Sequence, residues 1–149
     1  MNSQELQATL SFLLKKIEKE TIIWYLEGSV NLFVQGLPVQ PKDIDITTNS
    51  AGLNKFRKLF KKETIKDFYI EETRAHVLKC LFNNVESEIA VYEDTEKSSF
   101  DTIKLLSWNS LQLPTQPLTQ ALKFYKLIGR KEKSELIEKH LAEKPNFNE

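Results

Sequence analysis

The chain lacks the cysteines that a disulfide-stapled or cysteine-rich metal protein needs. Cys80 is the only cysteine among 149 residues, which excludes an internal disulfide and a cysteine-rich zinc site. Because Cys80 stands in an apolar run, we expect it to be a small core residue. A reducing compartment is compatible with this composition.

Long hydrophobic runs and an excess of charge of one sign are also missing. No segment approaches the roughly 20 apolar residues that span a bilayer, and acidic and polar residues interrupt the apolar positions of the N-terminal segment, unlike a signal peptide. The 21 basic and 21 acidic residues balance, so nothing global points to nucleic acid or an acidic membrane. We therefore expect a soluble, cytoplasmic protein without a membrane partner.

The patterns that are present predict one compact domain over residues 1–149, with enough apolar residues for a core. Short apolar runs predict strands at 22–26, 43–47, 65–70, 74–82 and 85–91. Helices are expected near the N-terminus, at 30–35, from Asn49 or Ser50 to about residue 61, and on both sides of Gly129. The predicted fold class is α/β (α+β), a small mixed sheet flanked by helices. An α/β core (1–113) carries a C-terminal helical pair (114–143).

Several connecting segments have their own signals. Asn83-Asn84 lies between two predicted strands and favours a tight hairpin, because asparagine tolerates left-handed backbone angles. Residues 100–113 are expected to hold a short helix and a short strand, and residues 114–117 a linker. The tail, residues 144–149, is expected to fray.

Two aspartates form the first candidate site. Asp43 and Asp45 are two residues apart on a predicted strand, so their side chains share a face. Neighbouring carboxylates repel each other unless a cation neutralises them, and carboxylate oxygens suit Mg²⁺ or Mn²⁺. A solvated strand end is the alternative interpretation.

Gly28-Ser29 lies where a predicted buried strand meets a short helix. Such a junction exposes backbone N–H groups and the positive end of the helix dipole. Gly28 permits close approach of a phosphate, and the Ser29 hydroxyl adds a donor. An ordinary turn is the alternative, but the Asp-x-Asp strand that follows favours a site for a metal-bound nucleoside triphosphate. Lys42 is either a further contact to the triphosphate or an exposed lysine.

A third carboxylate is expected to complete a two-metal site. Glu86 and Glu88 share one face of the strand at 85–91, and we prefer Glu88 because it lies nearer the centre of the strand. Glu86 is the fallback, and an exposed glutamate is the alternative for either. Weaker candidates near the site are His76, Lys123, Lys126, Arg130 and Tyr125.

These motifs resemble those of the nucleotidyltransferase superfamily, which includes DNA polymerase β, minimal bacterial and archaeal members, and lincosamide and aminoglycoside nucleotidyltransferases. The resemblance is carried by residues 24–29, 32, 35–36 and 41–46, and by residues 114–130 at the C-terminal end. The sequence is most similar to small stand-alone members related to AbiEii-type and antibiotic-modifying proteins. Glu27 departs from the pattern, because small or apolar residues are commoner before the glycine in similar proteins. An acid beside a phosphate site is unfavourable unless it faces away.

The resemblance implies a Mg²⁺-dependent (or Mn²⁺-dependent) transfer of a nucleoside monophosphate from a nucleoside triphosphate to an acceptor hydroxyl, with release of pyrophosphate. Gly28 and Ser29 would hold the β- and γ-phosphates. Asp43 and Asp45 would bind one metal ion and Asp45 and Glu88 a second, with Glu88 also deprotonating the acceptor.

The acceptor, whether a small molecule, a protein or an RNA end, is not specified by these motifs. Its site could lie across a homodimer or be supplied by a partner. An antitoxin-like protein that modifies or masks a toxin-like partner, and a nucleotide-binding protein without turnover, stay open as alternatives.

Overall fold

The structure, a computed structural model, describes residues 1–143, so the tail expected to fray lies outside the described residues. The helices are α1 (Ser3–Ile17), α2 (Gly28–Val34), α3 (Ser50–Leu59), the short 3-10 helix η1 (Thr95–Lys97), α4 (Leu118–Leu127) and α5 (Lys131–Glu143). The strands are β1 (Trp24–Glu27), β2 (Ile44–Thr48), β3 (Thr64–Ile70), β4 (Ala75–Phe82), β5 (Val85–Tyr92), β6 (Lys104–Trp108) and β7 (Leu111–Thr115).

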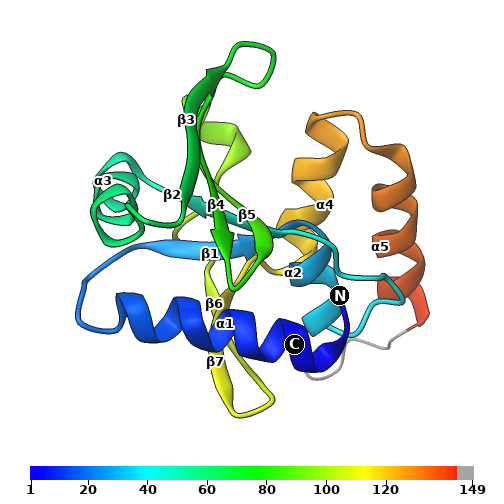
Figure 1. Cartoon of the computed structure of the whole chain (residues 1–149). Coiled ribbons are helices and arrows are strands. Elements are labelled where there is room, and N and C mark those ends of the chain that lie inside the picture. Colours follow the sequence, from blue (N-terminus) through cyan, green and yellow to red (C-terminus); the bar gives the residue numbers. More distant parts are fainter. Residues whose placement is uncertain (144–149) are drawn as a thin grey trace.

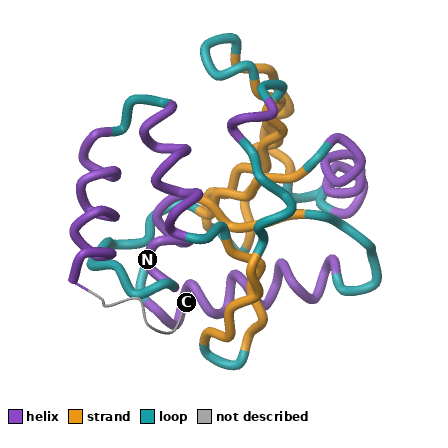
Figure 2. Tube along the Cα trace, turned by 180° about the vertical axis from the view of Figure 1, so that it is seen from behind, coloured by secondary structure: helices purple, strands orange, loops and turns teal. Residues whose placement is uncertain are grey.

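The strands form one mixed sheet in the order β3-β4-β5-β2-β1-β7-β6. β2 is parallel to β5 and β1 is parallel to β7, whereas the other neighbours are antiparallel. Figure 1 shows α1 and α3 at the lower front and left of the sheet and α4 and α5 side by side at the right, and Figure 2 shows the same arrangement from behind. The predicted mixed sheet with flanking helices and a C-terminal helical pair is thus confirmed.

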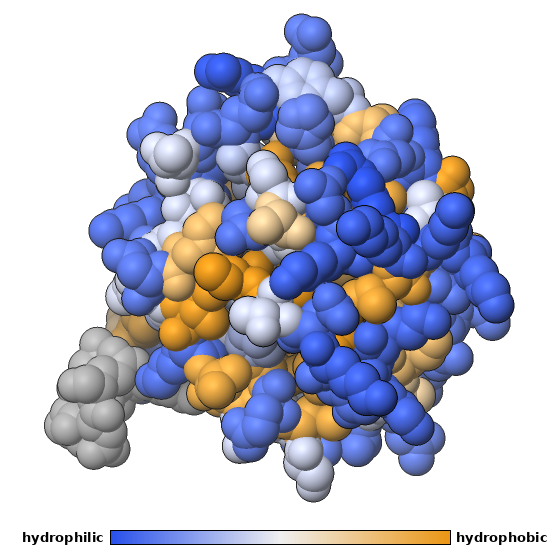
Figure 3. Space-filling view, turned by 90° about the vertical axis from the view of Figure 1, so that its left-hand side faces the viewer, coloured by the Kyte–Doolittle hydropathy of each residue, from blue (hydrophilic) through white to orange (hydrophobic). Residues whose placement is uncertain are grey.

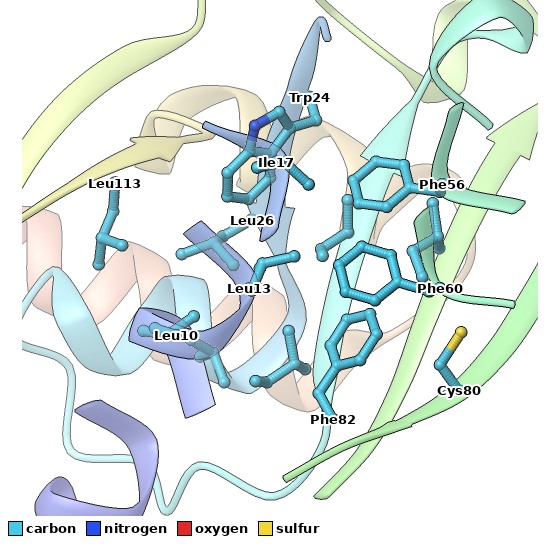
Figure 4. Packing of buried hydrophobic residues seen from close by; sticks show 14 of the residues in the cluster. Leu10, Leu13, Ile17, Trp24, Leu26, Phe56, Phe60, Cys80, Phe82 and Leu113 are labelled. Carbon is cyan, nitrogen blue, oxygen red and sulfur yellow. The ribbon is translucent and has the colours of Figure 1, made fainter. Parts of the chain in front are cut away.

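The larger core cluster lies between the sheet and the helices α1 and α3. The capping box of Asn2 and Glu5 starts α1, whose apolar residues then meet the inner face of the sheet at helical spacing. Phe60 packs between Phe56 and Phe82, with ring centroids 5.8 Å and 4.5 Å away (Figure 4). Cys80 is fully buried in this cluster, as expected.

A smaller core cluster joins the C-terminal helices to α2. It contains Leu32 and Leu37 beside Tyr125 of α4 and Ile137 of α5. Gly36, at a φ of 94°, follows the end of α2 and lets the Leu37 N–H donate to the carbonyl of Leu32 at 3.0 Å. These contacts hold α4 and α5 over the end of β1, where the Gly-Ser pair lies.

Two expectations about the segment after residue 100 were partly wrong. The expected short strand is present, but residues 104–115 form the two-stranded β6–β7 hairpin, with no helix of the kind expected, and β7 extends into the expected linker as far as Thr115. The two turn residues Asn109 and Ser110 both have positive φ. Pro114 is tolerated inside β7 because the ladder to β1 consists only of the Leu26–Thr115 pair. The hairpin has a weak sequence signal because much of β6 is exposed, including Leu105 at 67%.

The other boundaries differ by one to three residues. β1 begins at Trp24 and includes Glu27. β2 begins at Ile44, so Asp43 lies just before the strand instead of on it. Asn83 and Asn84 both have positive φ and form the predicted tight hairpin.

The surface is mixed in character. The face in Figure 3 is mostly hydrophilic, with hydrophobic residues gathered over its middle. Within the described residues, no helix has the length and apolar content that crossing a membrane requires.

Candidate active site

A cavity of about 400 Å³ lies between one face of the sheet and the turn from α4 to α5. Its walls come from segments far apart in the chain: the β1–α2 junction, the start of β2, the β3–β4 turn with the start of β4, the middle of β5, the end of α4 and the start of α5. The lining side chains that matter for chemistry are Glu27, Ser29, Lys42, Asp43, Asp45, Glu88, Tyr92, Tyr125, Arg130 and Lys133. The six predicted site residues, including Gly28, therefore line one cavity.

Gly28 is required by the position of Asp45. Its φ is +67°, and a Cβ at this position would overlap Oδ2 of Asp45 and lie 3.2 Å from Cγ of the same residue. A side chain here would be strained and would also displace the carboxylate. The glycine thus permits the Asp45 carboxylate to stand directly against the backbone that begins α2.

Ser29 joins the two motifs. Its Oγ accepts a hydrogen bond from the backbone N–H of Lys42 at 3.1 Å, so the hydroxyl hydrogen is free to donate to a ligand. Because α2 has only seven residues, its dipole adds little. The phosphate-binding capacity of this junction depends on the Ser29 hydroxyl and on backbone N–H groups.

The sheet register places three carboxylates in one row. Glu27 of β1 is the partner of Asp45 of β2, and Asp45 is the partner of Glu88 of β5. Burial, together with the charges of Glu88 and Asp43, raises the pKa of Asp45 to about 7. The row is electrostatically unfavourable without a cation.

Glu27 is the most deeply buried member of the row, with 5% of its surface exposed. Burial, with a smaller contribution from the charge of Asp45, raises the pKa of Glu27 to about 8. Its Oε1 and the hydroxyl of Thr47 have no hydrogen-bond partner among residues 1–143. Because Glu27 also lines the cavity, it faces the site instead of away from it.

The geometry distinguishes Glu86 from Glu88. The two residues share a face of β5, as expected, but only Glu88 lines the cavity. Glu86 is exposed, and its Oε1 lies 3.5 Å from Nζ of Lys79. Glu88 is thus the carboxylate that stands beside Asp45.

The opposite wall of the cavity is basic and aromatic. Arg130 and Lys133 line it, and neither forms an ion pair with a described residue. Tyr125 lines it as well but is buried in the smaller core cluster. Burial, and then the charge of Glu27, raises the pKa of Tyr92, which places a neutral phenol beside the carboxylates.

Three of the weaker candidates lie outside the cavity. Lys123 is exposed away from it, and Lys126 pairs with Glu138 at 3.7 Å. His76 packs against Tyr69 with ring centroids 4.8 Å apart. The sequence did not single out Lys133 or Tyr92 as site residues; the basic cluster after Gly129 was the only available signal for Lys133.

The donor set suits a hard divalent cation. Carboxylate oxygens are the ligands that Mg²⁺ and Mn²⁺ prefer. Burial is the main reason for the raised pKa of Asp45, and the negative charges of Glu88 and Asp43, which a cation would neutralise, raise it further. Within the described part of the chain, no three acidic, imidazole or thiol side chains converge closely enough to enclose an ion by themselves. A Mg²⁺ site of this kind is usually completed by water and substrate phosphate oxygens.

Comparison with known proteins supports the fold. No family model and no curated protein matches the sequence. A Thermotoga maritima protein assigned as a nucleotidyltransferase matches with a TM-score of 0.74 over 97% of both chains, at 21% identity. The lincosamide adenylyltransferase LnuA, bound to lincomycin, matches with a TM-score of 0.59 over 93% of this chain and 97% of that chain, at 14% identity.

The antibiotic-resistance factor ANT(2'')-Ia in solution matches with a TM-score of 0.66 over 95% of this chain and 86% of that chain, at 6% identity. These neighbours share the mixed sheet and the helical arrangement over nearly the whole chain. The chain therefore has the fold of the small nucleotidyltransferases, which confirms the fold that the sequence motifs imply.

Proposed function

We propose that this protein is a divalent-metal-dependent nucleotidyltransferase. The observation that carries the proposal is the register pair of Asp45 and Glu88, which stands in one cavity with Asp43 and the Gly28-Ser29 junction. Nucleotidyl transfer needs carboxylates, hydrogen-bond donors to phosphate and positively charged side chains that are not paired with acids, and all three kinds of group line this cavity.

The triphosphate is held at the β1–α2 junction. The backbone of Gly28 and the free hydroxyl hydrogen of Ser29 contact the β- and γ-phosphates. Lys42, Arg130 and Lys133 line the same cavity, and their positive charges offset those of the phosphates. The side chains of Arg130 and Lys133 are available for this purpose because no described carboxylate pairs with them.

Asp43, Asp45 and Glu88 hold the metal ions. When bound, Mg²⁺ or Mn²⁺ neutralises the phosphate charge and polarises the α-phosphate. The protein residues orient the phosphate chain between the Gly28-Ser29 junction on one side and Glu88 on the other, so that the attacking and leaving oxygens stand in line.

The reaction balances as a substitution at the α-phosphorus. The acceptor hydroxyl gives its proton to the Glu88 carboxylate, and its oxygen forms a bond to the α-phosphorus. The bond from that phosphorus to the bridging oxygen of the β-phosphate breaks, and pyrophosphate leaves. Positioning and charge neutralisation supply most of the rate.

The acceptor is proposed to be a hydroxylated molecule. LnuA is an adenylyltransferase bound to lincomycin, and a further neighbour, ANT(2'')-Ia, is bound to adenylyl-2''-tobramycin. By analogy, the acceptor of this chain presents a hydroxyl to Glu88, with a homodimer or partner protein completing its binding surface.

The test is thermal unfolding of the purified protein with ATP, GTP, CTP or UTP, with and without Mg²⁺. We expect a Mg²⁺-dependent rise in Tm with at least one nucleotide. The rise should be absent in Asp45→Asn and retained in the exposed loop variant Asp101→Asn. A rise that survives Asp45→Asn contradicts the proposed site. Nucleotide binding without pyrophosphate release from any acceptor would favour the masking or binding-only alternative.

A further inference from the structure

Glu27 is the feature that the proposed reaction leaves without a role. It is 5% exposed, and its Oε1 has no hydrogen-bond partner among the described residues. Burying an ionised carboxylate without a partner is strongly unfavourable. A buried acid in this position therefore needs a compensating interaction that the polypeptide itself does not supply.

The position of Glu27 points to the missing partner. Residues directly opposite on antiparallel strands have Cβ atoms about 5 Å apart, and Glu27 is directly opposite Asp45. Both side chains line the same cavity. Glu27 thus extends the acidic row by one strand beyond the residues that the proposed reaction uses.

The surroundings of Glu27 contain polar groups but no neutralising cation. Thr47 is buried, and its hydroxyl lies close enough to Glu27 to lower the pKa of that carboxyl, although no hydrogen bond of normal geometry joins them. Tyr92 and Tyr125 lie within electrostatic range of Glu27. No described lysine, arginine or histidine forms an ion pair with Glu27. A cation bound in the cavity would give the Glu27 carboxylate the partner that the described residues do not supply.

We infer that Glu27 supplies a fourth carboxylate to the divalent-cation site centred on Asp45. This inference rests on the proposed function, because it deepens the same site. It assigns a binding role to the residue that departs from the sequence pattern of similar proteins. Because these carboxylates do not enclose an ion by themselves, the inference implies that they attract a divalent cation whose coordination water completes before any nucleotide binds.

The test is binding of Mn²⁺ alone, measured from the electron paramagnetic resonance signal of the free ion. Wild type, Glu27→Gln, Asp45→Asn and the exposed turn variant Glu72→Gln are compared. We expect Glu27→Gln to raise the Kd for Mn²⁺ by about tenfold or more, and Glu72→Gln to leave it unchanged. A smaller increase in Glu27→Gln overturns the inference.

The glutamine variant separates ligation from hydrogen bonding. A neutral glutamate that only donates a hydrogen bond is replaced well by glutamine, so that role predicts an unchanged Kd. A second variant, Glu27→Asp, keeps the charge but withdraws it by one methylene. Its Kd is expected to lie between those of wild type and Glu27→Gln, and a wild-type Kd in Glu27→Asp contradicts the inference even if Glu27→Gln does not fold.

The two proposals fail in different ways. If Asp45→Asn weakens Mn²⁺ binding and Glu27→Gln does not, the inference fails and the proposed function stands. If wild type binds no Mn²⁺ in the absence of nucleotide, the inference fails, whereas the proposed function is still judged by the Mg²⁺-dependent rise in Tm with nucleotide, because substrate phosphates complete its metal site. If Asp45→Asn binds Mn²⁺ as tightly as wild type, the inference fails, and if the nucleotide-dependent rise in Tm also survives Asp45→Asn, both fail.

Discussion

At the scale of single residues, Gly28 shows how one missing side chain determines the site. Gly28→Ala puts a Cβ onto Oδ2 of Asp45 at a φ of +67°. We expect a stability loss of about 1 kcal/mol from the backbone and a loss of transfer rate on the order of 100-fold from displacement of the carboxylate. Pyrophosphate release and thermal unfolding measure the two effects.

The matched control is Gly129→Ala. Gly129 has a φ of +75°, but nothing lies within 4 Å of the position that a Cβ would take there. Gly129→Ala should therefore lose about as much stability as Gly28→Ala does from its backbone, with little change in transfer rate. Equal rate losses in the two variants would contradict the contact-based explanation.

Asp45 gives a prediction about pH. Its pKa is raised from 3.8 to about 7 in the folded protein, so the folded state binds a proton more readily than the unfolded state. Without metal, stability should therefore fall as the pH rises through that range. We expect the Tm of wild type to be lower at about pH 8 than at about pH 5, and Asp45→Asn to show a smaller drop. The control variant Asp101→Asn should show the same drop in Tm as wild type. An equal drop in Asp45→Asn would refute the assignment of this pH dependence to Asp45.

At the scale of elements, β5 carries two glutamates on one face that differ only in their neighbours. Glu88 stands beside Asp45, and Glu86 pairs with Lys79. We expect Glu88→Gln to lower the transfer rate on the order of 10²- to 10⁴-fold, as for loss of a general base, while sparing nucleotide binding. Glu86→Gln should have little effect on pyrophosphate release. A greater loss in Glu86→Gln would assign the third carboxylate to that residue.

At the scale of the whole molecule, α2 connects the two core clusters. Val30 and Val34 belong to the larger cluster and Leu32 to the smaller one. We therefore propose that the α/β core and the C-terminal helices unfold together as a single domain. Leu32→Ala should cost about 2–5 kcal/mol and shift one cooperative transition. Tryptophan fluorescence, from Trp24 and Trp108, and far-UV circular dichroism should report the same midpoint, and two separate midpoints would contradict a single domain.

Local patterns in the sequence predicted most of the elements. The helical spacing of α1, the hairpin at Asn83-Asn84 and the glycine after α4 follow from the backbone preferences of a few neighbouring residues. The β6–β7 hairpin was missed because its strands are short and partly exposed, so apolar alternation is weak there. Its turn residues, Asn109 and Ser110, both have positive φ.

The sequence by itself determined the chemical parts: a glycine and a serine after a buried strand, two aspartates two residues apart, and a glutamate on a later strand. Only the tertiary structure decided how they combine. The register of β1, β2 and β5 brings Glu27 and Glu88 to opposite sides of Asp45, and the packing of α4 and α5 places Arg130 and Lys133 over the cavity. Local preferences act between near neighbours in the chain, whereas register and helix docking depend on the packing of the whole core.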